Sequence, residues 1–513
     1  MAIDSKHLPD DPKILQGMVL DLMAQLDREF TERHKIETLL RELLDAKKNR
    51  KSEQLSTDQL ALFAAAWQAR QAAMEPEKPS EEPDDEDKDS PAGSGATGKK
   101  KTSGRQALPR HLKRERIVHD LADSEKHCNI CQQGLRPIGE ESSERYEYIP
   151  AQLTVIEDVC KKYACACTVK TATKPSQPIE KSTAGASLLA QVIVAKCSDH
   201  LPLHRQEQIF ARHGVNLSRK TMCGWLAQCA GLLEPLYGAA KDVLFASQVI
   251  GTDDTGVKVL DEKLPFARTG RIWPYYGDKD HPVIVYDYTA TRERAGPEKF
   301  LKGYRGYLQA DAYGGYDAFF KDPARGLIEV GCWAHARRYY HKALESDQPR
   351  MGPALLLIAQ LYRVDKRARG LTAEERMQLR QVDARPILDK LRDYLEEIQA
   401  EVLPKSPAGK AVRYTLKNWT ALTRYCEDGD LEIDNNHTER SIRSVAVGRN
   451  NWVFFGSDGG GHTAAVLRSF VASCQRVGVD PFAWFNDVLS RIGAHTITRL
   501  TELLPHNWVP AQA

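Results

Sequence analysis

The chain has 513 residues, of which 42% are hydrophobic and 28% charged, and its formal net charge is +2. That length predicts roughly three to four domains at about 150 residues each. No apolar run approaches the roughly 20 residues that cross a bilayer, and the start, MAIDSKHLPDD, lacks the order of a secretory signal, which excludes membrane-spanning and secreted proteins. We therefore expect a cytosolic protein whose 11 cysteines are thiols or metal ligands.

The near-neutral total hides two charged runs. Residues 75–90 carry nine acidic and two basic side chains, a local charge of −7, and residues 99–116 carry eight basic and one acidic, a local charge of +7. A basic run of this kind indicates a surface that binds polyanions such as nucleic acid. The alternative is solvated linker, which we favour for the acidic run.

The first 74 residues have a helical pattern. Apolar residues recur every three or four positions from Ile14 onward, and neither Pro nor Gly interrupts the chain between Met18 and Met74. This predicts one or two long helices with a stripe suited to a coiled-coil partner, so self-association and packing onto the chain's own body are both open. Residues 75–104, rich in Pro, Ser, Gly and charge, are expected to be disordered.

Two cysteine pairs follow. Cys128 and Cys131 form a Cys-x-x-Cys motif, and Cys165 and Cys167 form a Cys-x-Cys motif some thirty residues later. Four thiolates at this spacing predict a structural Zn²⁺ site, which can hold together a segment too small for its own core. The fourth ligand is open, because Cys160 or His127 can substitute. The alternative is buried free cysteines.

Residues 201–230 predict a helix-turn-helix. A first helix ends near His213-Gly214, and Ser218 is expected to cap a second helix that carries the apolar residues Met222, Trp225 and Leu226. Arg219 and Lys220 open that helix, where contacts with bases or phosphates are usually made. Two helices joined by a Gly turn also occur in proteins that bind no DNA.

Between residues 247 and 345 the pattern alternates between strand and helix. Ser247–Leu260 is expected as a strand that delivers Asp253 and Asp254 at its end. Further expected elements are strands over 271–276 and 282–286, a helix over 296–303, a strand over 306–311, a short helix, a strand over 327–332 and a helix from Ala334. This is the order of a ribonuclease-H-like fold, whose first and fourth strands are neighbours. Asp253 and Asp311 should therefore meet although they are 58 residues apart.

A third carboxylate follows much later. Residues 346–430 have helical spacing and predict an all-helical insertion, after which Glu439 projects from a predicted helix beside cations. On that helix alone, Glu439 also fits an exposed i,i+4 pair with Arg443. Another helix is expected from the glycines at 459–461 through Val477, and Asp480-Pro481 starts a helical tail.

The three carboxylates together suggest a reaction. Asp253, Asp311 and Glu439 cannot all stay ionised and unpaired in one cleft, because like charges raise one another's pKa. Two Mg²⁺ ions about 3.5–4 Å apart resolve this, and they serve phosphodiester chemistry by activating a water or a 3′ hydroxyl. Magnesium is preferred to zinc because all three ligands are hard oxygens. Each aspartate alone also fits a strand-end cap or a turn.

Several motifs resemble one known family. They are DDT at 253–255, LQADAYGGY around Asp311, CWAHARR at 332–338 and NNHTERSIRSVAVGRNNWVFFGS at 435–457. They look like the transposases of the insertion-sequence 66 (IS66) family, the largest protein that such elements encode. The resemblance extends over RPIGEESSERYEYIPAQ, KYAC, RQEQIFARHGVNLSR and RLTELLPHNW, and so covers most of residues 120–508.

The resemblance implies a metal-dependent transposase with Asp253, Asp311 and Glu439 as its acidic triad, holding two Mg²⁺ (or Mn²⁺) ions. Cys332 and His335 match the family's Cys-x-x-His element, whose role is open among a second zinc site, a structural clamp and a DNA contact. The sequence departs from the family pattern at Asp254 (usually Glu), at Asn450 (frequently Lys) and in the Cys-x-Cys pair. The departure in the Cys-x-Cys pair affects only the assignment of the fourth zinc ligand.

The expected partners follow from this activity. They are double-stranded DNA at the element ends and in the target, further copies of the chain, and small accessory proteins of the same element, in a bacterial cytoplasm at the nucleoid and without a membrane. The candidate DNA contacts are Arg219, Lys220, Arg440, Arg443 and Arg449. Two other readings remain: a nuclease or resolvase of the same fold that does not join strands, and a zinc-containing DNA-binding regulator that has lost catalysis.

We expect a multidomain α/β protein with a ribonuclease-H-like core. The expected segments are 1–74, helical and coiled-coil-like; 75–117, linker; 118–172, zinc module; 173–240, helix-turn-helix region; 241–345, first part of the core; 346–430, insertion; 431–485, second part of the core; and 486–513, helical tail.

Overall fold

The computed structural model describes residues 59–64, 67, 152–164, 169–171, 176–261, 263–312 and 314–511. The chain divides into two compact units, residues 1–76 with 162–513, and residues 77–161. The first unit holds almost all described residues, including a helical turn at 59–64 within the range predicted as helical. The charged runs and the Cys-x-x-Cys pair lie outside the described residues, as does most of the predicted coiled coil.

A short hairpin opens the first unit. Strand β1 (Lys162–Ala164) pairs antiparallel with β2 (Val169–Thr171), and Tyr163 lies opposite Lys170. Cys165 and Cys167 fall in the loop between the two strands, at 165–168, outside the described residues. None of the helices over the described residues is both long and apolar enough to cross a membrane.

The centre of the unit is a mixed sheet. Over the described residues it has seven strands: β3 (Val249–Thr252), β4 (Thr255–Val259), β5 (Arg268–Tyr276), β6 (Ile284–Thr289), β7 (Gly306–Gln309), β8 (Leu327–Val330) and β9 (Phe454–Phe455). β6, β5, β3, β7 and β8 lie side by side in that order. β3, β7 and β8 run parallel, and β5 is antiparallel to both β3 and β6. The prediction that the first and fourth strands are neighbours is confirmed by the β3–β7 pairing.

The strand predicted over 247–260 is interrupted. β3 and β4 both pair antiparallel with β5, with Thr252 opposite Tyr275 and Thr255 opposite Ile272. The register is the same on both sides of the break, so β3 and β4 follow one line along β5. Asp253 and Asp254 therefore occupy the interruption rather than the end of the strand. A further strand, β9, was not predicted and pairs in parallel with β4.

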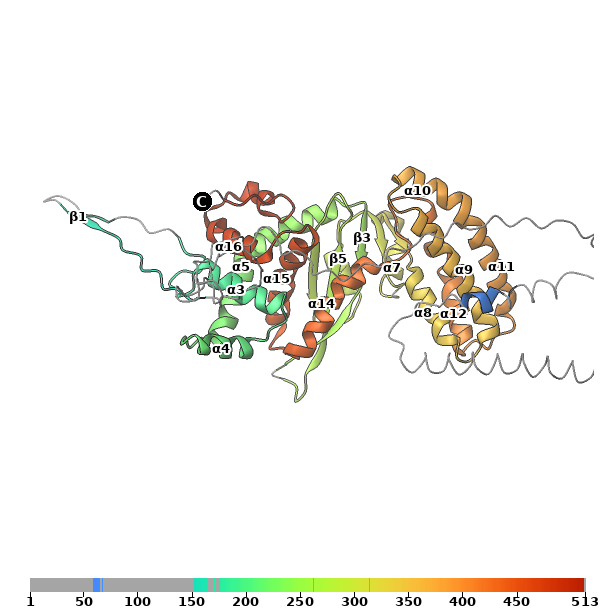
Figure 1. Ribbon diagram of the computed structural model, residues 1–513, viewed down its shortest axis with the longest axis horizontal. Helices are drawn as coiled ribbons and strands as arrows, with labels where there is room; N and C mark the ends of the chain where they lie inside the picture. The colour runs from blue at the N-terminus through green and yellow to red at the C-terminus, as the bar shows by residue number, and fades with distance from the viewer. Residues whose placement is uncertain are drawn as a thin grey trace, which may run out of the picture. The chain divides into compact units, whose positions relative to one another are not determined.

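Both faces of the sheet are covered. Along β6 the side chains alternate, with Val285 in one core cluster and Ile284 and Tyr286 in another, as the pleat of a strand requires. The first cluster contains residues of α3 (Ala186–Cys197), α5 (Arg219–Phe245), α15 (Asp458–Arg476) and α16 (Pro481–Arg491). The second includes Val445 and Trp452 of α14 (Asn436–Trp452). Figure 1 shows the strands between these helices and a further helical group.

The predicted helix-turn-helix is present. α4 (Leu203–Arg212) ends at a turn in which Gly214 has φ +76°, and the Ser218 hydroxyl accepts the Thr221 backbone N–H at 3.1 Å to cap α5. Met222, Trp225 and Leu226 are buried, as expected. α5 runs five residues past the expected domain boundary at 240, because its apolar face continues along the sheet through Leu244.

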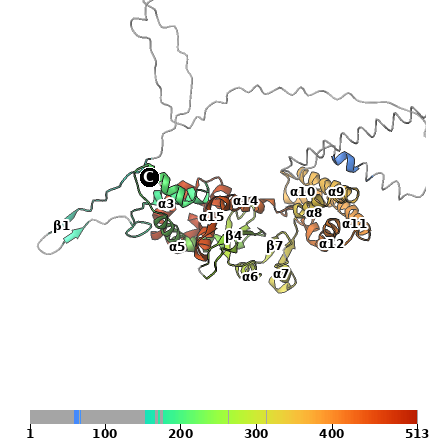
Figure 2. The same cartoon turned by 90° about the horizontal axis from the view of Figure 1, so that it is seen from below.

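Helices fill the rest of the described chain. Two short helices, α6 (Ala295–Phe300) and α7 (Asp317–Phe320), flank β7 in sequence. After β8 come α8 (Trp333–Ala343), α9 (Gln348–Arg367), α10 (Ala373–Leu379), α11 (Arg385–Gln399), α12 (Pro407–Lys417) and α13 (Trp419–Thr423). Five of them share one core cluster with Val330 of β8, and Leu379 of α10 packs against it. In Figures 1 and 2, α8 to α12 gather at one side of the sheet. Shorter turns are η3 (Pro323–Arg325), η4 (Arg380–Ala384), η5 (Arg424–Cys426), η6 (Ile492–Ala494) and η7 (Ile497–Leu503).

A close approach joins α14 to the sheet. A Cβ at Gly251 would lie 2.3 Å from Oγ1 of Thr438 and 2.8 Å from Oδ1 of Asn435, distances that real side chains do not tolerate. Only glycine lets the first turn of α14 lie directly on the end of β3. The helix that carries Glu439 is thereby placed beside the strand that leads to Asp253.

We predict that Gly251→Ala destabilises the protein by about 1–3 kcal/mol, the usual cost of forcing extra atoms into a packed interior. Urea unfolding followed by circular dichroism measures it. Gly256→Ala in β4 is the matched control, because its added Cβ meets only the ends of side chains that can move, the methyl group of Thr269 at 3.2 Å and the guanidinium group of Arg271 at 3.6 Å. Equal losses in the two variants would contradict the role given to Gly251.

Candidate active site

Three adjacent parallel strands deliver polar side chains to one edge of the sheet. Gly251 of β3 pairs with Gln309 of β7, which pairs with Val330 of β8. Asp253, Asp311 and Cys332 each lie two residues beyond this row. Because parallel strands end at the same edge, the register alone gathers these three residues. Ala312, next to Asp311, has φ +57°, a conformation that non-glycine residues rarely adopt and that is common at functional sites.

The segment before α14 is hydrogen-bonded across the same edge. The Gln309 amide donates to the Glu432 carbonyl at 2.7 Å, and the Trp333 backbone N–H donates to the Ile433 carbonyl at 3.1 Å. Asn435, only 2% exposed, donates its side-chain amide to the Thr252 carbonyl at 2.8 Å and its backbone N–H to the Cys332 thiol at 3.2 Å. These bonds tie the start of α14 to β3, β7 and β8, and so place Glu439 at the edge.

The pKa of Asp253 reflects its burial and the negative charge gathered at this edge. Burial and then the charge of Asp311 raise its pKa to about 7, and Glu439 adds to the effect. No ion pair with a cation is found for Asp253 within the described chain. The sequence prediction that two strands and a helix bring three carboxylates together is consistent with this repulsion. A divalent cation would relieve it.

The neighbouring Asp254 has a different environment. Its side chain is 2% exposed and forms ion pairs with Arg271 and Arg292, both at 2.7 Å. One guanidinium group contacts each of its oxygens, so the charge of Asp254 is already balanced without a metal ion. Of the two adjacent aspartates, Asp253 is therefore the one suited to ligand a metal.

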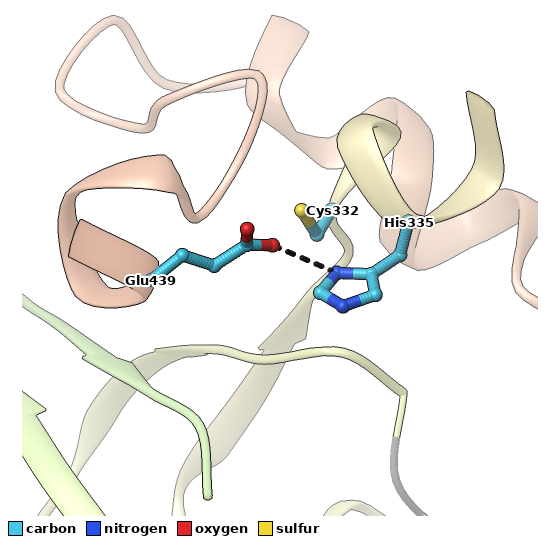
Figure 3. A group of neighbouring side chains, drawn as sticks. All are labelled: Cys332, His335 and Glu439. Atoms are coloured by element: carbon cyan, nitrogen blue, oxygen red, sulfur yellow. Dashed lines mark ion pairs between the residues drawn. The ribbon is translucent and has the colours of Figure 1, made fainter. Parts of the chain in front are cut away.

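Glu439 lies between the sheet edge and α8. Its Oε1 is 3.5 Å from Nδ1 of His335, and its Oε2 is 3.4 Å from Nη2 of Arg338. Figure 3 shows Glu439 and His335 pointing toward each other, with the Cys332 thiol close by. The alternative pairing of Glu439 with Arg443 is wrong, since both recorded ion pairs of Glu439 are with α8.

The candidate DNA contacts differ in accessibility. Arg219 is 68% exposed at the start of α5, with Glu207 3.4 Å away, and Lys220 beside it is exposed. Arg440 and Arg443 lie on the exposed side of α14. Arg449 instead donates to the Thr255 hydroxyl at 2.9 Å and the Gly256 carbonyl at 2.8 Å, which fastens α14 to β4.

Two residues at the edge escaped the sequence analysis. Asn435 clamps β3 to α14, and the Tyr414 hydroxyl, on α12, donates to the Asp311 backbone carbonyl at 3.1 Å. Asn435 stands within a motif that carried the family resemblance, which was a usable signal. Tyr414 had none, because its helix reaches the site only through the packing of the insertion.

The chain is similar to known proteins over most of its length. Residues 181–463, more than half of the chain, match the family described as "Transposase IS66 family". The chain belongs to the IS66 transposase family. Other parts match further IS66-type modules: 469–506 the "IS66 C-terminal element", 125–168 the "zinc-finger binding domain of transposase IS66", and 37–117 "Transposase C of IS166 homeodomain". The family resemblance seen in the motifs is thus confirmed, and the cysteine segment is a zinc-finger domain of the family.

Relatives of this IS66 family member extend over its length. The uncharacterized protein y4jD of Sinorhizobium fredii is 31% identical over 99% of this chain and 98% of its own. The uncharacterized protein y4hP of the same organism is 32% identical over 80% of this chain and 78% of its own. Their similarity extends over most of this chain. Because both relatives are uncharacterized, the activity of this chain has to be inferred from its site.

We predict that Asp254→Ala lowers the free energy of unfolding by about 3 kcal/mol, the low end for a broken buried ion pair, because both arginines retain partial access to water. Asp253→Asn should not share this loss. Chemical unfolding without metal compares the two variants. A larger loss for Asp253→Asn would reverse the structural and metal-binding roles assigned to the pair.

The raised pKa of Asp253 predicts a pH dependence of stability. In the metal-free protein the folded state holds this proton up to about pH 7, whereas the unfolded chain releases it near its ordinary pKa of 3.8, so the free energy of unfolding falls as pH rises between these values. Asp253→Asn should remove this fall. Urea titrations in chelator at about pH 5 and about pH 8 test it. Parallel pH profiles for wild type and variant would contradict the assignment.

Proposed function

We propose that this IS66 family member is a DNA transposase that binds the terminal repeats of an insertion sequence, cleaves a strand to free a 3′ hydroxyl and transfers that end to target DNA. The observation that carries the proposal is the convergence of Asp253, Asp311 and Glu439 on one sheet edge, where burial and then the charges of Asp311 and Glu439 raise the pKa of Asp253. Such activity belongs with the chromosome in the bacterial cytoplasm.

We also propose that the sheet and its helices form a ribonuclease-H-like core. The order β6-β5-β3-β7-β8, with β3, β7 and β8 parallel, supports it. The helical region before it then extends to Phe245 and the tail begins at Pro481, because α5 and α16 cross the boundaries expected from sequence. The helices α9–α13 constitute the insertion between the two parts of the core.

The three carboxylates fit Mg²⁺ or Mn²⁺. They supply hard oxygen ligands, Asp253 is buried and has no ion pair with a cation among the described residues, and Asp254 beside it is already paired. When bound, two such ions activate the attacking hydroxyl or water and stabilise the leaving oxygen. The protein's own part is positioning: the strand register sets Asp253 and Asp311, Asn435 holds α14 to them, and Arg338 keeps Glu439 in place.

DNA recognition is proposed for two regions. The exposed Arg219 and Lys220 open α5, and the basic run at 99–116 supplies further cations. The zinc-finger domain at 125–168 is proposed to hold Zn²⁺ through Cys128, Cys131, Cys165 and Cys167. Assembly of several copies through the N-terminal helices, and help from small accessory proteins of the element, belong to the same proposal.

We predict that Asp253→Asn, Asp311→Asn and Glu439→Gln each abolish strand cleavage and joining while leaving DNA binding nearly intact, because each removes a metal ligand. Labelled element ends incubated with Mg²⁺ and target DNA report both steps. Asp280→Asn is the matched control, because Asp280 is an exposed carboxylate in the turn between β5 and β6. This turn lies at the opposite end of β3 from Asp253, since the neighbouring Asp278 accepts the backbone N–H of Gln248, which precedes β3.

The same assay separates the competing functions. Cleavage without joining would favour the nuclease or resolvase, and specific binding without either step would favour the silent regulator. Persistent cleavage by any triad variant would remove that residue from the catalytic set.

We predict that Arg219→Ala narrows the difference in affinity between element ends and scrambled DNA by about 1–3 kcal/mol, the range for a bidentate base contact. Binding titrations at several salt concentrations measure it. Arg392→Ala, which removes an exposed arginine of α11, is the control. An equal loss on both DNAs would mean that Arg219 contacts phosphate and that sequence is recognised elsewhere.

A further inference from the structure

A second group of metal-ligating side chains lies beside the triad. Within the part of the chain that the structure describes, one group of three such residues has ligand atoms within 4.8 Å of one another: Cys332, His335 and Glu439. The carboxylate triad is an all-oxygen set, whereas this group offers one sulfur, one nitrogen and one oxygen. We propose that Cys332, His335 and Glu439 form a second site, which shares Glu439 with the triad, for a borderline transition-metal ion of the Zn²⁺ class.

The distance between His335 and Glu439 fits a shared metal ion better than it fits a hydrogen bond. Ligand atoms about 2.0–2.3 Å from a tetrahedral Zn²⁺ lie about 3.3–3.6 Å from each other. Nδ1 of His335 and Oε1 of Glu439 are 3.5 Å apart, beyond the usual range of a hydrogen bond. Oε1 of Glu439 is buried and accepts no hydrogen bond from the described residues.

The start of α8 places the sulfur of Cys332 beside His335, where both can bind one metal ion. Cys332 caps α8 and His335 lies three residues on, so both side chains face the same side of the first turn. The Asn435 backbone N–H donates to the sulfur at 3.2 Å, which favours a thiolate against the burial that raises the pKa of the Cys332 thiol to about 12. The other buried cysteines of the described chain, such as Cys426, have no such group around them.

The donor set selects the ion. A thiolate and an imidazole suit Zn²⁺ and its neighbours and are poor ligands for Mg²⁺. Three protein ligands leave the fourth tetrahedral position open for water or an oxygen of DNA phosphate. Glu439 belongs to both sets, so the ion would tie the triad's third carboxylate to α8 and connect the two sites. The proposal depends on no step of strand cleavage.

The test is zinc content of the full-length protein after chelation, reloading with excess Zn²⁺ and gel filtration. We expect about two equivalents in wild type, one from the zinc-finger domain and one from this site, and about one in Cys332→Ser and in His335→Gln. Cys426→Ser, a buried cysteine outside any cluster, and Asp253→Asn, which disables only the oxygen set, should both keep about two. Circular dichroism verifies that each variant is folded.

Cobalt provides an independent readout. In a Cys128→Ser/Cys131→Ser/Cys165→Ser/Cys167→Ser protein loaded with Co²⁺, a thiolate-to-metal charge-transfer band should remain, and it should vanish when Cys332→Ser is added. Wild-type zinc content in both Cys332→Ser and His335→Gln would overturn the proposal. Loss of zinc from Asp253→Asn alone would overturn it as well, because the ion would then be bound by the carboxylate triad. Neither result bears on whether triad variants lose strand transfer, so the two proposals fail separately.

Discussion

The hydrogen bonds made by residues 432–435 across the carboxyl ends of β3, β7 and β8 are the constraint on which the candidate site depends. Asp253 and Asp311 come together through strand register alone, but Glu439 is 128 residues from Asp311 and shares no strand pairing with it. Asn435 bridges Thr252 and Cys332, and Gly251 provides the space for this contact. These bonds are what hold the start of α14 at the ends of β3, β7 and β8.

The two adjacent aspartates at this edge have different electrostatic environments. Asp254 is neutralised by two arginines, whereas Asp253, one residue away, is buried beside other carboxylates with its pKa raised to about 7. A protein that needed only stability would gain by pairing or removing such a group. Retaining it at the ends of parallel strands, where ligands commonly bind, is consistent with a site built to bind cations.

The helical insertion contributes to the site as well as separating its parts. Tyr414 of α12 donates to the backbone of Asp311, and its ring stacks on Tyr339 of α8 at a centroid distance of 4.6 Å. α8 in turn presents His335 and Arg338 to Glu439. The insertion therefore supports Asp311 from one side, while α8 holds Glu439 on the other. Substitutions in the core of the insertion should consequently change the positions of residues at the site.

Local patterns in the sequence determined most strands and helices from Ser218 to Val477, the neighbouring positions of Asp253 and Asp311, and the family, because alternation, capping and motif spacing are short-range properties. They did not predict β9 or the interruption between β3 and β4. Sequence alone did not separate Asp253 from Asp254 or show that Arg449 fastens α14 to β4. It also left the role of Cys332 and His335 open. Those questions were decided by tertiary structure, since each depends on partners such as Arg271, Arg292, Thr255 and Glu439 that meet only when distant segments pack. Electrostatic environment and ligand geometry are properties of that packing, and no spacing along the chain encodes them.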